Sequence, residues 1–321
     1  MSKIRVPFQL PTILLGCWVC LLAGCTDQTT DQPKKVDAGD LKSNTVVAIS
    51  YPLEFLTRRI AGASINVVLP YPAEIKDPQN WRPSPEAIGQ MQSADLIFTN
   101  GTGATYANWI TTTSLPESKI RNTASKGLAL SDYIAVDDVT IVHSHGPEGE
   151  HSHSTMVARS WLDPMVAKKQ ATYIAAELAE VYPDQASEFK TNLKSLGDEL
   201  DLIAEKIKGV QVKQPNALIS ATPKLKFLTR SLGSGEQHLT WFETPSPDQA
   251  ESDLKRFLPS DGPKPKLILF DNVLPSDEIM MIVKQNGIKA LAIDLLDQKP
   301  MAGDFLTALR DNIETIADAL N

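Results

Sequence analysis

Short β-rich runs alternate with helical patterns along most of this chain, and this alternation limits the possible folds more than any other feature. Runs typical of strands cover residues 45–50, 65–69, 95–99 and 139–142 in the first half and 217–220, 239–242, 267–271 and 288–294 in the second. Helical patterns separate them, such as residues 275–285 and the helix start at Ser84-Pro85-Glu86. The alternation predicts an α/β fold built on parallel sheets.

A long amphipathic segment lies between the two halves. Residues 163–181 and 184–207 flank Pro183, and apolar residues recur in the second stretch at three- and four-residue spacing: Phe189, Leu193, Leu196, Leu200 and Ile203. We expect two similar parallel-sheet lobes joined by a long rigid helix, with a ligand cleft between the lobes. The predicted boundaries are 44–182 for the N-terminal lobe, 183–209 for the linker helix and 210–321 for the C-terminal lobe.

The N-terminal segment is typical of a secretory signal rather than of the folded body. Lys3 and Arg5 precede an apolar run over residues 13–23, and small residues lead up to Cys25. The run is too short to span a bilayer, which takes roughly 20 apolar residues. Leu22-Ala23-Gly24-Cys25 resembles the lipobox of bacterial lipoproteins, which implies a signal peptide over residues 1–24 and a lipid on Cys25. Residues 25–43 contain almost nothing apolar and are expected to form a flexible tether.

Charge and cysteine content exclude some classes of function. The chain has 31 basic and 39 acidic residues, a net charge of −8, and contains no long Lys/Arg block. A nucleic-acid partner is therefore not expected, because phosphate contacts need clustered positive charge. Removal of residues 1–24 also removes Cys17 and Cys20, so the mature chain would keep only the lipid-bearing Cys25 and could form no internal disulfide.

Four of the five histidines fall within residues 143–153 and give the strongest chemical signal in the chain: His143, His145, His151 and His153. Imidazole is a ligand for zinc, copper or nickel, and the intervening Gly/Pro loop could fold back so that two His-x-His pairs face one ion. The alternative is a solvated loop that binds nothing of consequence.

Enzyme signatures are not found. The chain has no Gly-x-Ser-x-Gly elbow and no Walker-type phosphate loop, and residues 101–106 fail the dinucleotide-binding pattern at its last position. His238 is the one histidine outside the cluster, and a structural role is expected for it. A protein that is not an enzyme is therefore predicted.

Several further motifs follow one another along the chain: Ser50-Tyr51-Pro52-Leu53, residues 77–85 (DPQNWRPSP), Ala94-Asp95-Leu96-Ile97 with Asn100-Gly101-x-Gly103, Trp161-Leu162-Asp163-Pro164 and Ala292-Ile293-Asp294. Together with the histidine-rich loop, and in this order from about residue 45 to the C-terminus, they resemble the zinc- and manganese-binding solute-binding lipoproteins of ABC transporters, the ZnuA/TroA-like family. The resemblance implies two α/β lobes joined by a rigid helix, with a metal ion between the lobes.

Most of the metal ligands that the resemblance implies are replaced here. Gln79 and Arg159 stand where the family has histidines, Thr222 where it has His or Glu, and only Asp294 matches the family's final aspartate. A guanidinium about 4 Å from a divalent ion would repel it by roughly 8 kcal/mol at an effective dielectric of 20. In one interpretation Arg159 pairs with Asp294 and leaves metal capture to the histidine loop. In the other, these four residues form a pocket for a different polar solute.

The leading hypothesis is an extracytoplasmic solute-binding lipoprotein that captures a transition metal for an ABC-transporter permease. The expected ion is Zn²⁺, with Mn²⁺ or no metal in the cleft as alternatives. The protein is expected to be a monomer in the bacterial cell envelope, lipid-anchored to a membrane on the periplasm side or at the cell surface. The alternative functions are a degenerate solute-binding protein with a non-metal polar ligand, and a surface metal buffer or adhesin.

Overall fold

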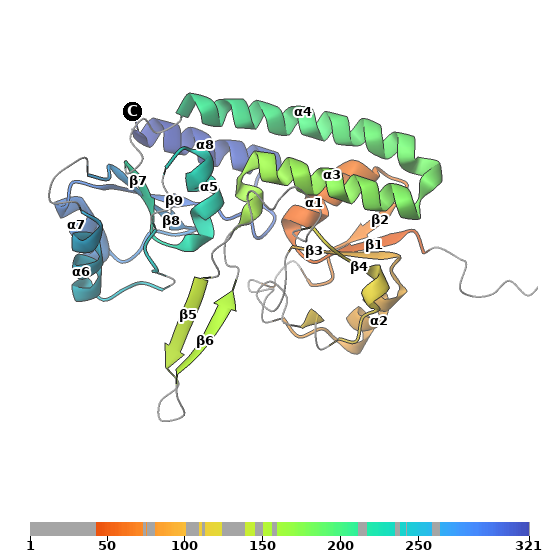
Figure 1. Cartoon of the computed structure of the whole chain (residues 1–321), viewed down its shortest axis with the longest axis horizontal. Coiled ribbons are helices and arrows are strands. Elements are labelled where there is room, and N and C mark those ends of the chain that lie inside the picture. Colours follow the sequence, from red (N-terminus) through yellow and green to blue (C-terminus); the bar gives the residue numbers. More distant parts are fainter. Residues whose placement is uncertain are drawn as a thin grey trace, which may run out of the picture. The chain divides into compact units, whose positions relative to one another are not determined.

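The computed structural model describes residues 43–72, 75, 81–100, 109–110, 113–123, 139–144, 150–155, 159–210, 217–234, 238–241, 243–258 and 264–320 (Figure 1). Within residues 139–144 and 150–155 it describes the backbone alone. The predicted signal peptide, Cys25 and almost all of the predicted tether lie outside these ranges.

The first half folds around a four-stranded parallel sheet in the order β2-β1-β3-β4. Its strands are β1 (Thr45–Ala48), β2 (Asn66–Val68), β3 (Leu96–Thr99) and β4 (Ile120–Asn122). Helix α1 (Tyr51–Ala61) connects β1 to β2, and α2 (Pro85–Ser93) precedes β3. The predicted start of α2 is confirmed, because the Ser84 hydroxyl accepts a hydrogen bond from the backbone N–H of Ala87.

The second half contains a three-stranded parallel sheet in the order β7-β8-β9. Its strands are β7 (Leu218–Ser220), β8 (Leu267–Asp271) and β9 (Lys289–Ile293), and its helices are α5 (Lys226–Ser231), α6 (Pro247–Phe257) and α7 (Asp277–Gln285). The predicted α/β class is therefore confirmed. The prediction of a strand over residues 239–242 is wrong for residues 239–241, which meet the sheet through a single bridge between Ser220 and His238.

Long helices run beside both sheets (Figure 1). These are α3 (Pro164–Val181), α4 (Ala186–Val210) and α8 (Phe305–Leu320). The Asp163 carboxylate caps α3 by accepting from the backbone N–H groups of Met165 and Val166. Pro183 interrupts the path between α3 and α4, as expected, and α4 contains the apolar spacing that predicted the long helix.

One hydrophobic core runs through both halves. Its fully buried members come from the first sheet, α1, the long helices and the second sheet, and include Val46, Leu53, Phe98, Leu196, Leu269 and Phe305. A smaller cluster packs on the second sheet and includes Ile219, Trp241 and Phe270. Because residues 42–321 group into one compact unit, the predicted lobe boundaries remain a prediction.

Candidate functional site

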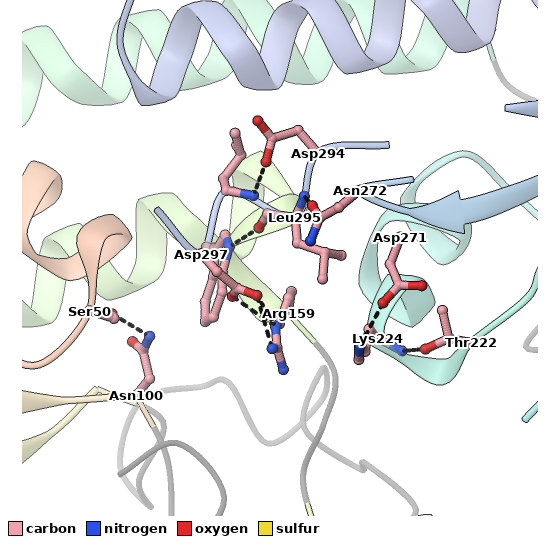
Figure 2. Close-up of polar contacts among 12 residues, drawn as sticks. Ser50, Asn100, Arg159, Thr222, Lys224, Asp271, Asn272, Asp294, Leu295 and Asp297 are labelled. Carbon is pink, nitrogen blue, oxygen red and sulfur yellow. Dashed lines mark hydrogen bonds and ion pairs between the residues drawn. The ribbon is translucent and has the colours of Figure 1, made fainter. Parts of the chain in front are cut away.

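Three segments that are far apart in the sequence meet between the two sheets, and we call their meeting point the intersheet junction: residues 159–161, 222–224 and 294–297 (Figure 2). The backbone N–H of Arg159 donates to the carbonyl of Lys224 at 2.9 Å. The indole Nε1 of Trp161 donates to the carbonyl of Leu295 at 2.8 Å. The structure thus brings together three of the four segments that hold the predicted ligand positions, those of the replaced Arg159 and Thr222 and of the retained Asp294.

The side chain of Arg159 pairs with Asp297, not with Asp294. Its Nε lies 2.9 Å from Oδ1 of Asp297, and its Nη2 lies 3.0 Å from Oδ2, which makes two parallel charge-assisted bonds. The side chains are 8% and 22% exposed. The expected pair between Arg159 and Asp294 is therefore wrong, because the loop turns between the two aspartates.

Asp294 is exposed and stabilises the loop that follows β9. Its Oδ1 accepts from the backbone N–H of Leu296 at 2.8 Å, and its backbone carbonyl accepts from Nδ2 of Asn312 at 2.8 Å. Leu296 has a φ of 57°, a left-handed conformation that is costly for a residue with a Cβ. The carboxylate of Asp294 therefore supports this turn, and in Figure 2 it lies away from Arg159.

Thr222 is fully buried and already has a structural role. Its hydroxyl accepts from the backbone N–H of Lys224 at 3.1 Å and caps the short 3₁₀ turn Pro223–Leu225. Lys224 in turn pairs with Asp271, with 2.5 Å between Nζ and Oδ2. Asp271 and Asp297 were missed by the sequence analysis, and the position of Asp271 at the end of a predicted strand could have revealed it.

The region expected to hold Gln79 is only partly described, and Gln79 itself lies outside the described residues. Ile75 is described, and its carbonyl accepts from Nε2 of Gln298 at 3.0 Å. Trp81 makes edge-to-face contacts with Tyr71 and Trp109, at centroid distances of 5.8 and 5.0 Å. On the side of the first sheet, Nδ2 of Asn100 donates to the hydroxyl of Ser50 at 2.7 Å (Figure 2).

The described part of the histidine-rich segment lies in two paired strands rather than in the predicted loop, and we call this strand pair the hairpin. Strands β5 (Val139–Ser144) and β6 (Glu150–Thr155) pair in antiparallel fashion, with His143 opposite His151 and Ile141 opposite His153. Because directly opposite positions share a face, as do positions two apart, residues 143, 151 and 153 occupy one face of the hairpin. His145 lies outside the described residues.

The described side chains of the junction do not fit a bound metal ion. Where side chains are described, no group of three or more His, Cys, Asp or Glu residues could hold a metal ion. Asp297 in the junction and Asp271 beside it already pair with Arg159 and Lys224, respectively. A divalent ion would have to displace these cations.

Trp161→Phe is expected to lower the free energy of unfolding by about 1–2 kcal/mol, because it leaves the carbonyl of Leu295 without its 2.8 Å partner. Urea denaturation of the two proteins measures the difference. Trp241→Phe is a control that removes a buried indole bond to Asp253 away from the junction. A Trp161→Phe variant as stable as the parent chain would contradict the assigned role of this bond.

Comparison with known proteins assigns the chain to a family over nearly its whole length. The family described as "Zinc-uptake complex component A periplasmic" matches residues 46–319. The manganese ABC transporter substrate-binding lipoprotein PsaA of Streptococcus pneumoniae (strain TIGR4) is 24% identical over 332 residues, which cover 100% of this chain and 98% of PsaA. The high-affinity zinc uptake system protein ZnuA of Bacillus subtilis (strain 168) is 22% identical over 334 residues, with 96% of each chain covered.

Solved structures show the same fold. FpvC of Pseudomonas aeruginosa, determined in complex with Ni²⁺, has a TM-score of 0.64 at 17% identity and covers 86% of this chain and 96% of its own. The metal-dependent lipoprotein YcdH of Bacillus subtilis has a TM-score of 0.61 at 18% identity, with 86% of this chain and 99% of that chain covered. None of the described helices is both long enough and apolar enough to cross a bilayer.

Proposed function

Because this chain belongs to the family of zinc-uptake component A proteins, which are substrate-binding proteins of metal ABC transporters and not enzymes, we propose that it captures Zn²⁺ outside the cytoplasm and delivers it to a permease. The observation that carries the proposal is the hairpin register, in which His143 lies opposite His151 and position 153 shares their face. Imidazole nitrogen suits zinc, so we place metal capture at His143, His145, His151 and His153.

A competition titration tests this proposal directly. The purified protein is titrated with Zn²⁺ in the presence of a chromophoric chelator, and then with Mn²⁺ under the same conditions. Zinc is expected to bind more tightly than manganese, because imidazole ligands favour zinc whereas carboxylate and water suit manganese. Equal weak binding of both ions would contradict capture by the hairpin.

A second candidate is a binding protein for a polar solute other than a metal. The pairs Arg159–Asp297 and Lys224–Asp271 favour it, since they place two cations at the junction. A metal-free protein that binds an organic solute, detected by mass spectrometry of the native protein, would support this candidate over the first.

A lipid on Cys25 would hold the protein at the bacterial envelope, with residues 26–43 as its tether. Cys25→Ser should move the protein from the membrane fraction to the soluble extracytoplasmic fraction or leave it as an unprocessed precursor, because the acyl chains are lost. Fractionation with an antibody against the C-terminal half measures this. Processed Cys25→Ser protein that stays wholly with membranes would show that the lipid is not the anchor.

A further inference from the structure

The segment that leads into α3 connects the two halves of the fold. Along its length, α3 is attached to β4 and to the residue that follows it: Nε2 of Gln170 donates to the hydroxyl of Thr123 at 3.1 Å, and Glu177 pairs with Arg121. At its near end, Arg159 is attached to the second half through the carbonyl of Lys224 and the carboxylate of Asp297. Residues 159–163 and α3 therefore form a strut between the sheets.

The geometry and the burial of the Arg159–Asp297 pair favour a strong ion pair. A planar guanidinium meets a carboxylate through two parallel bonds, and the Arg159 side chain is only 8% exposed. The guanidinium also lies over the ring of Trp161, with its Cζ 5.8 Å from the ring centroid. Solvent and salt screen such a pair much less than an exposed one.

The loop that carries Asp297 is pre-organised for this contact. Leu296 is fully buried with a φ of 57°, a conformation that persists only when the surroundings enforce it. Three contacts enforce it: Asp294 accepts from Leu296, Asn312 donates to Asp294, and the backbone N–H of Leu295 donates to Oδ1 of Asn272 at 2.9 Å. The strained turn places Asp297 against Arg159.

Further contacts join the halves beside this pair. Gln298 donates to the carbonyl of Ile75, and the rings of Phe55 in α1 and Phe305 in α8 lie 5.4 Å apart. These contacts join the two halves through the chain's own side chains, and a positive charge at the junction belongs to Arg159.

We infer that the guanidinium of Arg159 determines the specificity of the intersheet junction. Paired with Asp297, it holds the two halves of the fold together when no ligand is bound, and it prevents a divalent metal ion from binding at the junction. A divalent ion would meet a like charge and a carboxylate that is already neutralised. The inference goes beyond the proposed function and does not depend on whether the hairpin binds metal.

Hydrogen exchange of the processed lipoprotein in detergent tests the inference. The background carries His143→Asn, His145→Asn, His151→Asn and His153→Asn, so that zinc at the hairpin does not contribute. With Arg159 intact, exchange in peptides covering residues 159–162 and 294–298 should be the same with zinc as with chelator. Arg159→Met should speed exchange in these peptides at least about tenfold, because the strut is released from Asp297.

Asp297→Asn is the second variant, because it keeps the shape of the side chain and should speed exchange in the same peptides. Lys206→Met is the matched control, since it breaks an exposed pair with Glu314 and should leave the junction unchanged. The inference is overturned if zinc slows exchange at the junction while Arg159 is present, or if neither Arg159→Met nor Asp297→Asn alters it. The metal content of the unmodified protein reports separately on the proposed function.

Discussion

Replacing His143, His145, His151 and His153 with asparagine is expected to weaken zinc binding by at least about 100-fold, because the ion loses its imidazole donors. Asparagine retains a polar side chain of modest size, so the hairpin itself is expected to persist. The backbone register that places His143 opposite His151 underlies this expectation. Chelator competition at neutral pH measures the loss.

The same binding should depend on pH. Zinc needs neutral imidazole, so the affinity for zinc should fall as the pH drops through about 6.5, the ordinary pKa of histidine.

The matched control for the four histidine replacements carries Ser144→Asn, Ser152→Asn and Ser154→Asn. These changes add asparagines to the same hairpin and leave all four histidines in place. Undiminished zinc affinity in the variant that lacks the four hairpin histidines would place the zinc site elsewhere in the chain.

Arg159→Met should lower the free energy of unfolding by about 3 kcal/mol, because the largely buried carboxylate of Asp297 loses its two bonds to the guanidinium. Asp297→Asn should destabilise the protein through the same lost pair. The double variant should therefore cost less than the two single changes added together, with a coupling energy of about 1–3 kcal/mol. Urea denaturation of the four proteins measures this cycle.

The exposed pair between Lys206 and Glu314 provides the control for this cycle. Its side chains are 47% and 50% exposed, so Lys206→Met should change stability by no more than about 0.5 kcal/mol. An additive cycle at Arg159 and Asp297 would show that the two residues do not stabilise each other in solution.

The regular elements were predictable where their sequence pattern is strong. Residues 267–271 form β8 over the predicted range, because four consecutive apolar residues suit a strand that is buried on both faces. Residues 239–241 show why such patterns can fail. Leu239 and Trp241 are buried, but their backbone N–H groups bond the carbonyls of Ser220 and Ala221 beside the end of β7, and no ladder continues.

The segments that form the candidate site were predictable from the sequence, but the ion-pair partner of Arg159 was not. Arg159, Thr222 and Asp294 were expected to converge, and their segments do meet. Asp294 and Asp297 lie three residues apart, and the sequence offers either as a partner for Arg159. The choice depends on the left-handed turn at Leu296, which long-range bonds from Asn272 and Asn312 enforce. A local pattern contains no signal for such bonds.

Elemental analysis of the purified, processed protein after dialysis tests most directly the claim that the hairpin captures a transition metal. We expect zinc to remain with the unmodified protein and with Arg159→Met, and to be absent from the variant that lacks the four hairpin histidines. An unmodified protein without any transition metal would contradict the claim, and so would a variant without the four hairpin histidines that retains as much zinc as the parent.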